Sequence, residues 1–289
     1  MSKKVAVVTG SNKGLGLATV ETLLRRLPGA AVYLTSRDEK RGQEALQRLQ
    51  AAGLNPRFHQ LDVADRESIR RFRDHLQTEH GGLDYLVNNA AVANSVALFN
   101  NYEETKEIID INYKSIIDIE ELLYPLVRKG GRIVNISSDC GHLSNVRNDY
   151  WRQKLAREDI TDADIDAFVE WHLEAVRTGA FDRSDIADEG TVAAYRVAKV
   201  ALSARTILQQ RRLAARDISV NSMHPGLVRT DMTLGVGFLS AAEAAATPVY
   251  LLLDAPASLR GAYVWHDRSV LDWRDYNADY YFKASTLKA

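Results

Sequence analysis

Tyr195 and Lys199 are the residues whose types and spacing most directly suggest chemistry. They stand four positions apart in a segment with helical spacing of apolar residues, so one helix face would carry both side chains. A phenol with a pKa of about 10 exchanges protons poorly at neutral pH, but a neighbouring cation stabilises the phenolate and lowers that pKa. The pair could therefore pass a proton to or from a substrate oxygen, although the same spacing is also common in surface pairs.

Two adjacent serines form a second candidate. Ser137 and Ser138 follow an expected strand at 132–136, at the edge where α/β sheets place their ligands. A hydroxyl there could donate a hydrogen bond to a carbonyl oxygen as negative charge develops on it. The alternative is that the serines only cap a turn or a helix.

Glycines are concentrated between the first expected strand and the first expected helix, in Thr9-Gly-Ser-Asn-Lys-Gly-Leu-Gly16. Such a turn lets the backbone approach a pyrophosphate closely, and the helix N-terminus adds free N–H groups. The strand–loop–helix context favours nucleotide binding over a plain turn.

The second expected strand ends at Ser36-Arg37, where NAD binders tend to carry an acid and NADP binders a basic group. Arg37 can pair with a ribose 2′-phosphate in bidentate fashion, and Lys13 could add a second positive charge. Asp38 is better explained as the cap of the second helix. This pattern favours NADPH over NADH, although Arg37 could also be a solvated surface charge.

These residues need elements to position them, and short apolar strands alternate with longer amphipathic helices along the chain. The alternation is typical of βαβ units. We therefore expect an α/β fold, a Rossmann-type doubly wound parallel sheet of about seven strands with helices on both faces, in a single domain over residues 1–289. The expected strands are 4–9, 31–35, 57–61, 83–87, 132–136, 218–223 and 262–265; the expected helices are 15–27, 38–52, 68–80, 103–128, 191–215 and 240–253.

One segment, 145–190, breaks this alternation. It is highly charged, contains Trp151 and Trp171, and shows no strand signal. Thr161 resembles a helix cap, with an acid three residues later. We expect a mostly helical insertion before Tyr195.

Composition excludes several classes of function. The 289 residues include 37 Lys and Arg and 38 Asp and Glu, giving a net charge of −1. This balance argues against bulk binding to nucleic acid or to anionic membranes. The single cysteine, Cys140, excludes an intramolecular disulfide and a zinc site built on several cysteines; we expect no metal, and we interpret Cys140 as a small residue near the site. With no apolar run of about 18 residues, we expect a soluble cytoplasmic protein.

Taken together, the motifs resemble those of a known family. Thr9-Gly-x-x-x-Gly-x-Gly16, Asn88-Asn-Ala90, Ser137-Ser138, Tyr195-x-x-x-Lys199 and Pro225-Gly226 occur in the order and spacing of the short-chain dehydrogenase/reductases. Within that family the chain is most similar, over roughly residues 4–273, to the monomeric NADPH-dependent carbonyl reductases. The resemblance implies reduction of ketones, aldehydes or quinones to alcohols, with a small-molecule carbonyl compound as substrate.

The resemblance also implies roles for individual residues. Tyr195 would be the general acid, Lys199 would lower its pKa and bind the nicotinamide ribose, and Ser138 would hold the substrate oxygen. Asn112 would anchor a water that links Lys199 to solvent. The NADPH-binding set would be Gly10, Ser11, Asn12, Lys13, Gly14, Leu15, Gly16, Arg37, Asp62, Val63, Asn89, Ala90, Tyr195, Lys199, Pro225, Gly226, Val228 and Thr230.

Other readings of the same residues stay open. The fold could serve the reduction of a conjugated C=C bond, alcohol oxidation, or a regulator that binds NADPH without turnover. Fifty-seven positions separate Ser138 from Tyr195, far more than in most of the family. In the relatives this insertion covers a helix face that otherwise builds tetramers, so a monomer is implied, with the insertion walling the substrate cleft.

The chain departs from the family pattern at three places. Ala91 replaces a usual glycine, Met223-His224 stands where a cysteine is frequent, and the tyrosine-rich tail 274–289 extends past the usual end. His224, His142, Trp171 and His172 are further candidates near the site, each with a structural explanation available.

Overall fold

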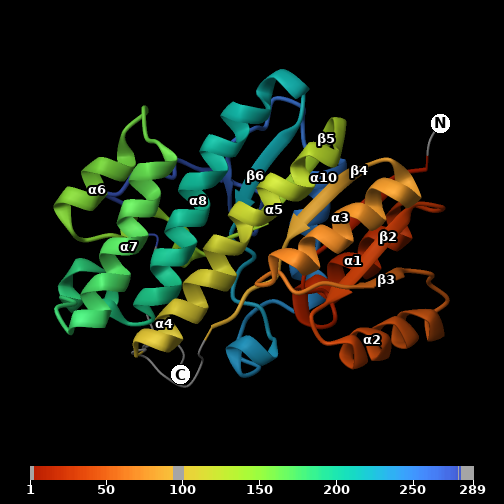
Figure 1. Cartoon of the computed structure of the whole chain (residues 1–289), viewed down its shortest axis with the longest axis horizontal. Coiled ribbons are helices and arrows are strands. Elements are labelled where there is room, and N and C mark those ends of the chain that lie inside the picture. The colour runs from red at the N-terminus through yellow and green to blue at the C-terminus, as the bar shows by residue number, and fades with distance from the viewer. Residues whose placement is uncertain (1–2, 94–100, 279, 281–289) are drawn as a thin grey trace.

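A central β-sheet organises the molecule. The computed structural model describes residues 3–93, 101–278 and 280 (Figure 1). Within these the sheet has the strand order β3-β2-β1-β4-β5-β6-β7-β8. Neighbouring strands are parallel from β3 to β7, and β8 runs antiparallel to β7. The strands are β1 (Val5–Val8), β2 (Ala31–Ser36), β3 (Arg57–Gln60), β4 (Leu83–Asn88), β5 (Val127–Ile136), β6 (Ser219–Met223), β7 (Tyr263–Val264) and β8 (Val270–Leu271).

This arrangement confirms the α/β, doubly wound parallel sheet, to which β8 adds one short antiparallel strand. The chain order reverses between β1 and β4, which creates the switch point where such sheets bind ligands. Strand β8 has only two residues, too few to give an alternating pattern in the sequence.

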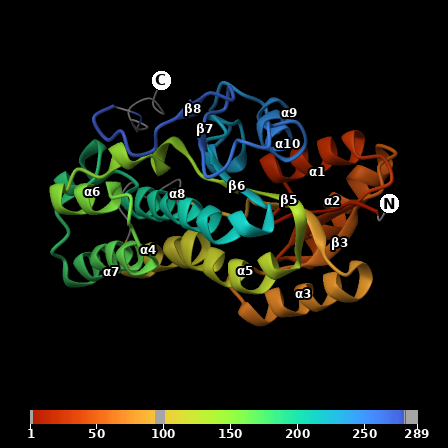
Figure 2. The ribbon, with the colours of Figure 1, turned by 90° about the horizontal axis from the view of Figure 1, so that it is seen from above.

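Helices cover both faces of the sheet (Figure 2). The helices are α1 (Gly14–Arg26), α2 (Glu39–Ala51), α3 (Arg66–His80), α4 (Tyr102–Ile109), α5 (Ser115–Leu123), α6 (Asp149–Ala156), α7 (Asp162–Thr178), α8 (Ala193–Leu213), α9 (Ala241–Ala244) and α10 (Ala246–Leu253). Both faces of β1 are buried: Val5 and Val7 join one apolar cluster with α3 and α5, and Ala6 and Val8 join another with α1 and α10. Burial on two faces explains why the strand is apolar throughout.

Two expected helices are wrong in their extent. The segment 103–128 contains α4, a π-helical turn η1 (Asp110–Lys114), α5 and a 3-10 turn η2 (Tyr124–Leu126), after which β5 begins at Val127. The segment 240–253 divides into α9 and α10 near Ala245. Pro248 explains this break, because it has no N–H with which to continue the helical hydrogen bonds from Ala244.

The insertion is mostly helical, as expected, and consists of α6, α7 and two 3-10 turns, η5 (Arg183–Asp185) and η6 (Asp188–Gly190). Thr161 caps α7 in a reciprocal capping box with Asp164. Phe168 and Leu173 of α7 belong to an apolar cluster that also includes Val197 of α8. The insertion therefore shares a core with the helix that carries Tyr195.

The two ends of the insertion are held side by side. The Ala187 N–H donates to the Asn145 carbonyl at 2.8 Å, and Val146 forms an antiparallel bridge with Ile186. Arg196, which has no exposed surface, donates to the Thr191 carbonyl at 2.8 Å and to the Asn145 side chain. One guanidinium thus joins both ends, directly beside Tyr195.

Among the described residues no helix is both long and apolar enough to cross a membrane, and the same residues contain no cluster of three potential metal ligands.

The turn after β1 lies directly against the end of β4. Gly10 has φ +59°, and a Cβ on it would stand 2.8 Å from the Cα of Ala90. A Cβ on Gly16 would stand 2.5 Å from the Asn89 side-chain nitrogen. A larger residue at either position would push the two segments apart, because real Cβ contacts are not this short.

Gly10→Ala tests this packing against Gly53→Ala, since Gly53 also has positive φ (+74°) but faces open space. The left-handed conformation costs both variants about 1–2 kcal/mol. Only Gly10→Ala must also displace Ala90, so we expect it to lose clearly more free energy of unfolding in urea. Equal losses for the two variants would contradict the close approach.

Candidate active site

The candidate residues meet at the carboxyl edge of the sheet. Lys199 projects from α8 toward the end of β5, where its Nζ donates to the Ile136 carbonyl at 2.7 Å. The same Nζ lies 5.5 Å from the centre of the Tyr195 ring. Ser138 stands two residues after the end of β5, and its hydroxyl is the group that acts to lower the pKa of Tyr195. The structure therefore brings Ser138, Tyr195 and Lys199 together from two elements distant in sequence.

Tyr195 and Lys199 have opposite pKa shifts with a common cause. Burial lowers the pKa of Lys199 to about 8. Burial also raises the pKa of Tyr195 above its usual 10, and the neighbouring Cys140 and Asp139 act in the same direction. The neighbouring Ser138 hydroxyl opposes that rise. Lys199 Nζ lies close to the Tyr195 ring, and its expected lowering of the pKa of Tyr195 stays a prediction. Tyr195 stays protonated at neutral pH, as a proton donor requires.

Ser138 is held by its own loop. Its Oγ accepts a hydrogen bond from the Cys140 N–H at 3.2 Å and donates one to Asp139 Oδ1 at 2.8 Å. Its carbonyl accepts from the Tyr263 hydroxyl. Burial raises the pKa of the Cys140 thiol to about 12, which agrees with its interpretation as a small near-site residue and not a nucleophile.

Asn112 lies in the π-helical turn η1, which the sequence did not reveal. Its Oδ1 accepts from the Val92 N–H at 2.8 Å, and its Nδ2 donates to the Val92 carbonyl at 2.7 Å. The widened turn points the amide at the segment after β4, and such turns are frequent at functional sites. Asn112 thus fixes the backbone that continues from Asn89 and Ala90.

The glycine turn and the end of β4 form a second part of the site. Thr9 Oγ1 accepts from the N–H groups of Asn89 and Ala90 at 2.9 and 3.0 Å. Asn89 Nδ2 donates to the carbonyls of Thr9 and Gly10 at 2.9 and 3.0 Å. With its amide nitrogen occupied, Asn89 supports the turn that is expected to hold a pyrophosphate.

Helix α1 begins inside this turn with an open N-terminus. No side chain caps it, and its first turn holds no acid, so its N–H groups and dipole favour an anion. Thr230 reaches the same place, because a Cβ on Gly14 would lie 3.4 Å from its Cγ2. Residues more than 200 positions apart in the sequence thus lie side by side at the start of α1.

Of the two basic residues expected to hold a 2′-phosphate, Lys13 forms a salt bridge with a described residue and Arg37 does not. The Arg37 guanidinium is exposed and forms no salt bridge within the described residues. Lys13 Nζ, in contrast, lies 2.7 Å from Asp231 Oδ2, with both side chains largely exposed. Lys13 must exchange this partner before it can contact a phosphate. Asp38 accepts from the Arg41 N–H at 3.0 Å, which confirms its role as the cap of α2.

The remaining residues of the expected cofactor set lie along the same edge. Ser11 joins β1 to β2 by donating to the Val8 carbonyl and accepting from the Thr35 N–H. Asp62 Oδ1 accepts from the Ala64 N–H at 3.0 Å. Asn12 and Leu15 belong to the turn after β1 and the start of α1, Val63 is buried after β3, and Pro225, Gly226 and Val228 follow β6.

The departures from the family pattern have structural explanations. Ala91 has no positive φ, so its methyl group causes no backbone strain. His224 does face the site: its Nδ1 accepts from the Asp139 N–H at 2.8 Å, and its ring lies 4.3 Å from that of Trp265. The described part of the tail ends at Tyr280; residue 279 and residues 281–289 lie outside the described residues.

The other aromatic candidates are structural. His142 is buried, with its ring nitrogens bonded to Ser144 and to the Asp272 carbonyl. His172 is buried edge-on against Phe181 in the insertion, and its ring nitrogens have no partner within the described chain. Two residues that face the site, Asp139 and Trp265, were missed. Only the position of Asp139 directly after Ser138 could have indicated it.

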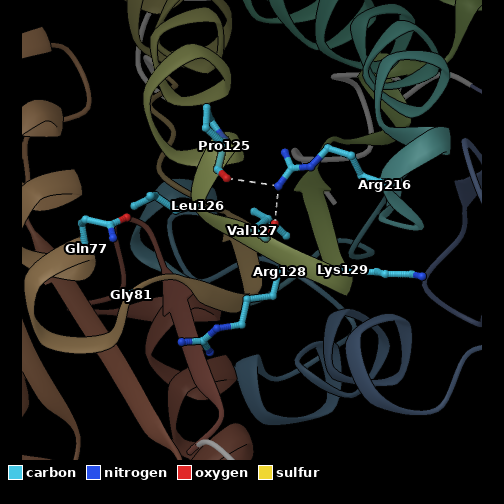
Figure 3. Close-up of a pocket in the computed structure, with 8 residues that line it drawn as sticks. All are labelled: Gln77, Gly81, Pro125, Leu126, Val127, Arg128, Lys129 and Arg216. Atoms are coloured by element: carbon cyan, nitrogen blue, oxygen red, sulfur yellow. Dashed lines mark hydrogen bonds between the residues drawn. The ribbon is translucent and has the colours of Figure 1, made fainter.

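The cavity drawn in Figure 3 is separate from this site. It measures about 420 Å³ and includes Pro125, Lys129 and Arg216. Arg216 donates to the carbonyls of Tyr124 and Pro125 at 3.0 and 3.1 Å, so its charge fastens the backbone before β5. The cavity lies where β5 begins, at the opposite edge of the sheet from Ser138.

Comparisons with known proteins agree with this geometry. Residues 4–163 match the family described as short chain dehydrogenase. The chain is 39% identical over 284 residues to carbonyl reductase [NADPH] 1 of Mus musculus, covering 94% of this chain and 99% of the mouse protein. Salutaridine reductase from Papaver somniferum superposes with a TM-score of 0.82 at 30% identity, covering 92% of this chain and all of the other. Menthone neomenthol reductase from Mentha piperita gives a TM-score of 0.77 at 27% identity over 92% and 99% of the two chains. The chain belongs to the short-chain dehydrogenase family.

Proposed function

We propose that this protein reduces small-molecule carbonyl compounds (ketones, aldehydes or quinones) to alcohols with NADPH. The observation that carries the proposal is the convergence of Ser138, Tyr195 and Lys199 beside the glycine turn at one edge of the sheet. The names of the mouse relative and of others like it, carbonyl reductase [NADPH], support the reaction and the cofactor.

The residues present fit a dinucleotide. Added Cβ atoms would obstruct the turn after β1 at Gly10 and Gly16, and the open N-terminus of α1 offers N–H groups to a pyrophosphate. Arg37 is free to hold a 2′-phosphate, and Asp62 and Val63 stand after β3, where they would contact adenine. NADPH, when bound, supplies the hydride.

The protein's own groups supply binding, orientation and a proton. Ser138 donates a hydrogen bond to the substrate oxygen, for which its hydroxyl must turn from Asp139 Oδ1. Tyr195, kept protonated by burial, donates its proton to that oxygen as negative charge develops. Lys199 donates a hydrogen bond to the Ile136 carbonyl and lies close to the Tyr195 ring. From this position it can bind the nicotinamide ribose.

Removal of the phenol tests the mechanism. Tyr195→Phe should lower kcat by at least about 100-fold, since it removes the proton donor, while the Kd for NADPH changes only a few-fold. The measurement is NADPH consumption with a quinone and an activated diketone, together with calorimetry. Tyr150→Phe, an exposed tyrosine of the insertion, is the control. Full activity in Tyr195→Phe would refute the mechanism, and a saturated ketone formed from an unsaturated one would show C=C reduction instead.

Cofactor preference tests the assignment of Arg37. Arg37→Gln should raise KM for NADPH by about tenfold or more, because it removes a bidentate charge-assisted pair, and should leave KM for NADH nearly unchanged. Arg48→Gln, a basic residue at the other end of α2, removes the same charge without approaching the cofactor. Wild-type preference for NADH would contradict the argument.

We further propose that the protein works as a monomer in the cytoplasm. Helix α7 of the insertion is fastened to the α4–α5 face: the Tyr113 hydroxyl donates to Asp166 at 2.7 Å, and Lys114 pairs with Glu170 at 2.9 Å. This face is therefore occupied by the chain's own helix.

Light scattering after size exclusion tests the oligomeric state. We expect a mass near the 32.3 kDa of one chain, at protein concentrations from micromolar upward. A mass four times as large would contradict the proposal that the insertion replaces a subunit contact.

A further inference from the structure

Asp139 places a carboxylate beside the reacting groups. Its Oδ1 accepts from the Ser138 hydroxyl at 2.8 Å and from the Cys140 N–H at 2.9 Å. The charge reaches the phenol of Tyr195, since Asp139 is one of the groups that raise its pKa. Asp139 therefore stands one hydrogen bond away from the group that would hold the substrate oxygen.

The second oxygen of this carboxylate is free. Oδ2 forms no hydrogen bond with the described residues and is not buried, and the side chain keeps 19% of its surface exposed. A partly buried carboxylate usually has a cationic partner. Neither Lys nor Arg forms a salt bridge with Asp139 in the described part of the chain.

His224 does not neutralise the carboxylate. Its Nδ1 lies 3.7 Å from Asp139 Oδ1, but that nitrogen accepts the Asp139 N–H, which leaves its lone pair occupied and the ring neutral. Burial also lowers the pKa of His224 to about 4, so the ring stays uncharged at neutral pH. Asp139 is thus a carboxylate beside Ser138 with no salt bridge to a Lys or Arg among the described residues.

We propose that Asp139 selects carbonyl compounds that carry a cationic ammonium group near the carbonyl. The ammonium N–H would donate to Oδ2, while the carbonyl oxygen takes the hydrogen bond of Ser138. An anionic substituent at the same place would be repelled by the carboxylate. This inference rests on the proposed carbonyl reduction and adds the charge class of its substrates.

The size of the expected substrate preference depends on the partial exposure of the Asp139 carboxylate. A charge-assisted hydrogen bond is about twice as strong as a neutral one, but water screens a carboxylate that keeps some exposed surface. We expect kcat/KM to be about tenfold higher for a cationic substrate than for a neutral one of equal shape. For an anionic substrate we expect kcat/KM to be lower than for the neutral one by a similar factor.

Three phenyl ketones of similar size test the proposal: 3-amino-1-phenylpropan-1-one as the cation, butyrophenone as its neutral isostere, and 3-benzoylpropanoate as the anion. Asp139→Asn removes the charge and keeps an amide oxygen that can accept from Ser138 and Cys140. We expect the cation-to-neutral ratio of kcat/KM to fall about tenfold in this variant, and the anion-to-neutral ratio to rise.

The ratios separate substrate selection from other effects of the substitution. A changed pKa of Tyr195 or a partly unfolded variant alters all three rates by the same factor and leaves both ratios unchanged. Asp74→Asn, on the exposed side of α3, makes the same change in net charge away from the site and should leave both ratios at their wild-type values.

Each outcome has one meaning. Equal ratios in wild type and Asp139→Asn, with butyrophenone reduced by both, would overturn the role of Asp139 and leave the proposed function intact. Failure of the wild type to consume NADPH with any ketone or quinone would overturn the proposed function itself.

Discussion

The close contact between the turn after β1 and the end of β4 is the constraint on which the site depends. Gly10 and Gly16 have no room for a Cβ because Ala90 and Asn89 stand against them. Asn89 then donates two hydrogen bonds to Thr9 across the contact, one from its backbone N–H and one from its side chain. This arrangement fixes the start of α1 relative to the carboxyl ends of the central strands. The geometry of this edge is consequently set by close backbone packing together with the side-chain hydrogen bonds of Thr9 and Asn89.

A buried network of polar side chains connects the central strands to helix α8, which carries Tyr195 and Lys199. Asn88 on β4 donates to Asn135 on β5 at 2.7 Å, and Asn135 donates to Thr206 and Gln209 of α8 at 2.8 and 2.9 Å. Each of these hydrogen bonds is strong in an apolar surrounding, and within the described residues Asn88 Oδ1 is the one atom of these four side chains that is buried without a partner. The network therefore restricts how α8 can slide or rotate on the sheet. This restriction fixes the position of Tyr195 and Lys199 relative to Ser138.

The sequence was sufficient for the arrangement of the elements but not for the details of their junctions. The alternation of strands and helices indicated the sheet, because burial on both faces makes a strand such as β1 apolar throughout. The π-helical turn at Asn112 was not visible, since it depends on hydrogen bonds to Val92, 20 positions away. The break before α10 could have been inferred from Pro248.

At the candidate site, motif spacing located Ser138, Tyr195 and Lys199 but not their electrostatics. The pKa of Tyr195 depends on how deeply α8 is packed, which no local pattern records. The pairing of Lys13 with Asp231 joins residues more than 200 positions apart, and the contact between Asp139 and His224 likewise crosses from β5 to β6. Such pairs become evident only when the loops at the sheet edge are assembled.

The hydrogen-bonded base of the insertion has a consequence for how this protein can diversify. The chain leaves the site at Asn145 and returns at Thr191, and both points are attached to the guanidinium of Arg196. The bridge between Val146 and Ile186 closes the base further. Beyond that base, Phe168 and Leu173 still pack in one core with α8, but the exposed surface of the insertion can change while Tyr195, the immediate neighbour of Arg196, keeps its place. The outer surface of the insertion is in this sense exchangeable, so evolution or a designer can alter it without rebuilding the segments that hold Tyr195.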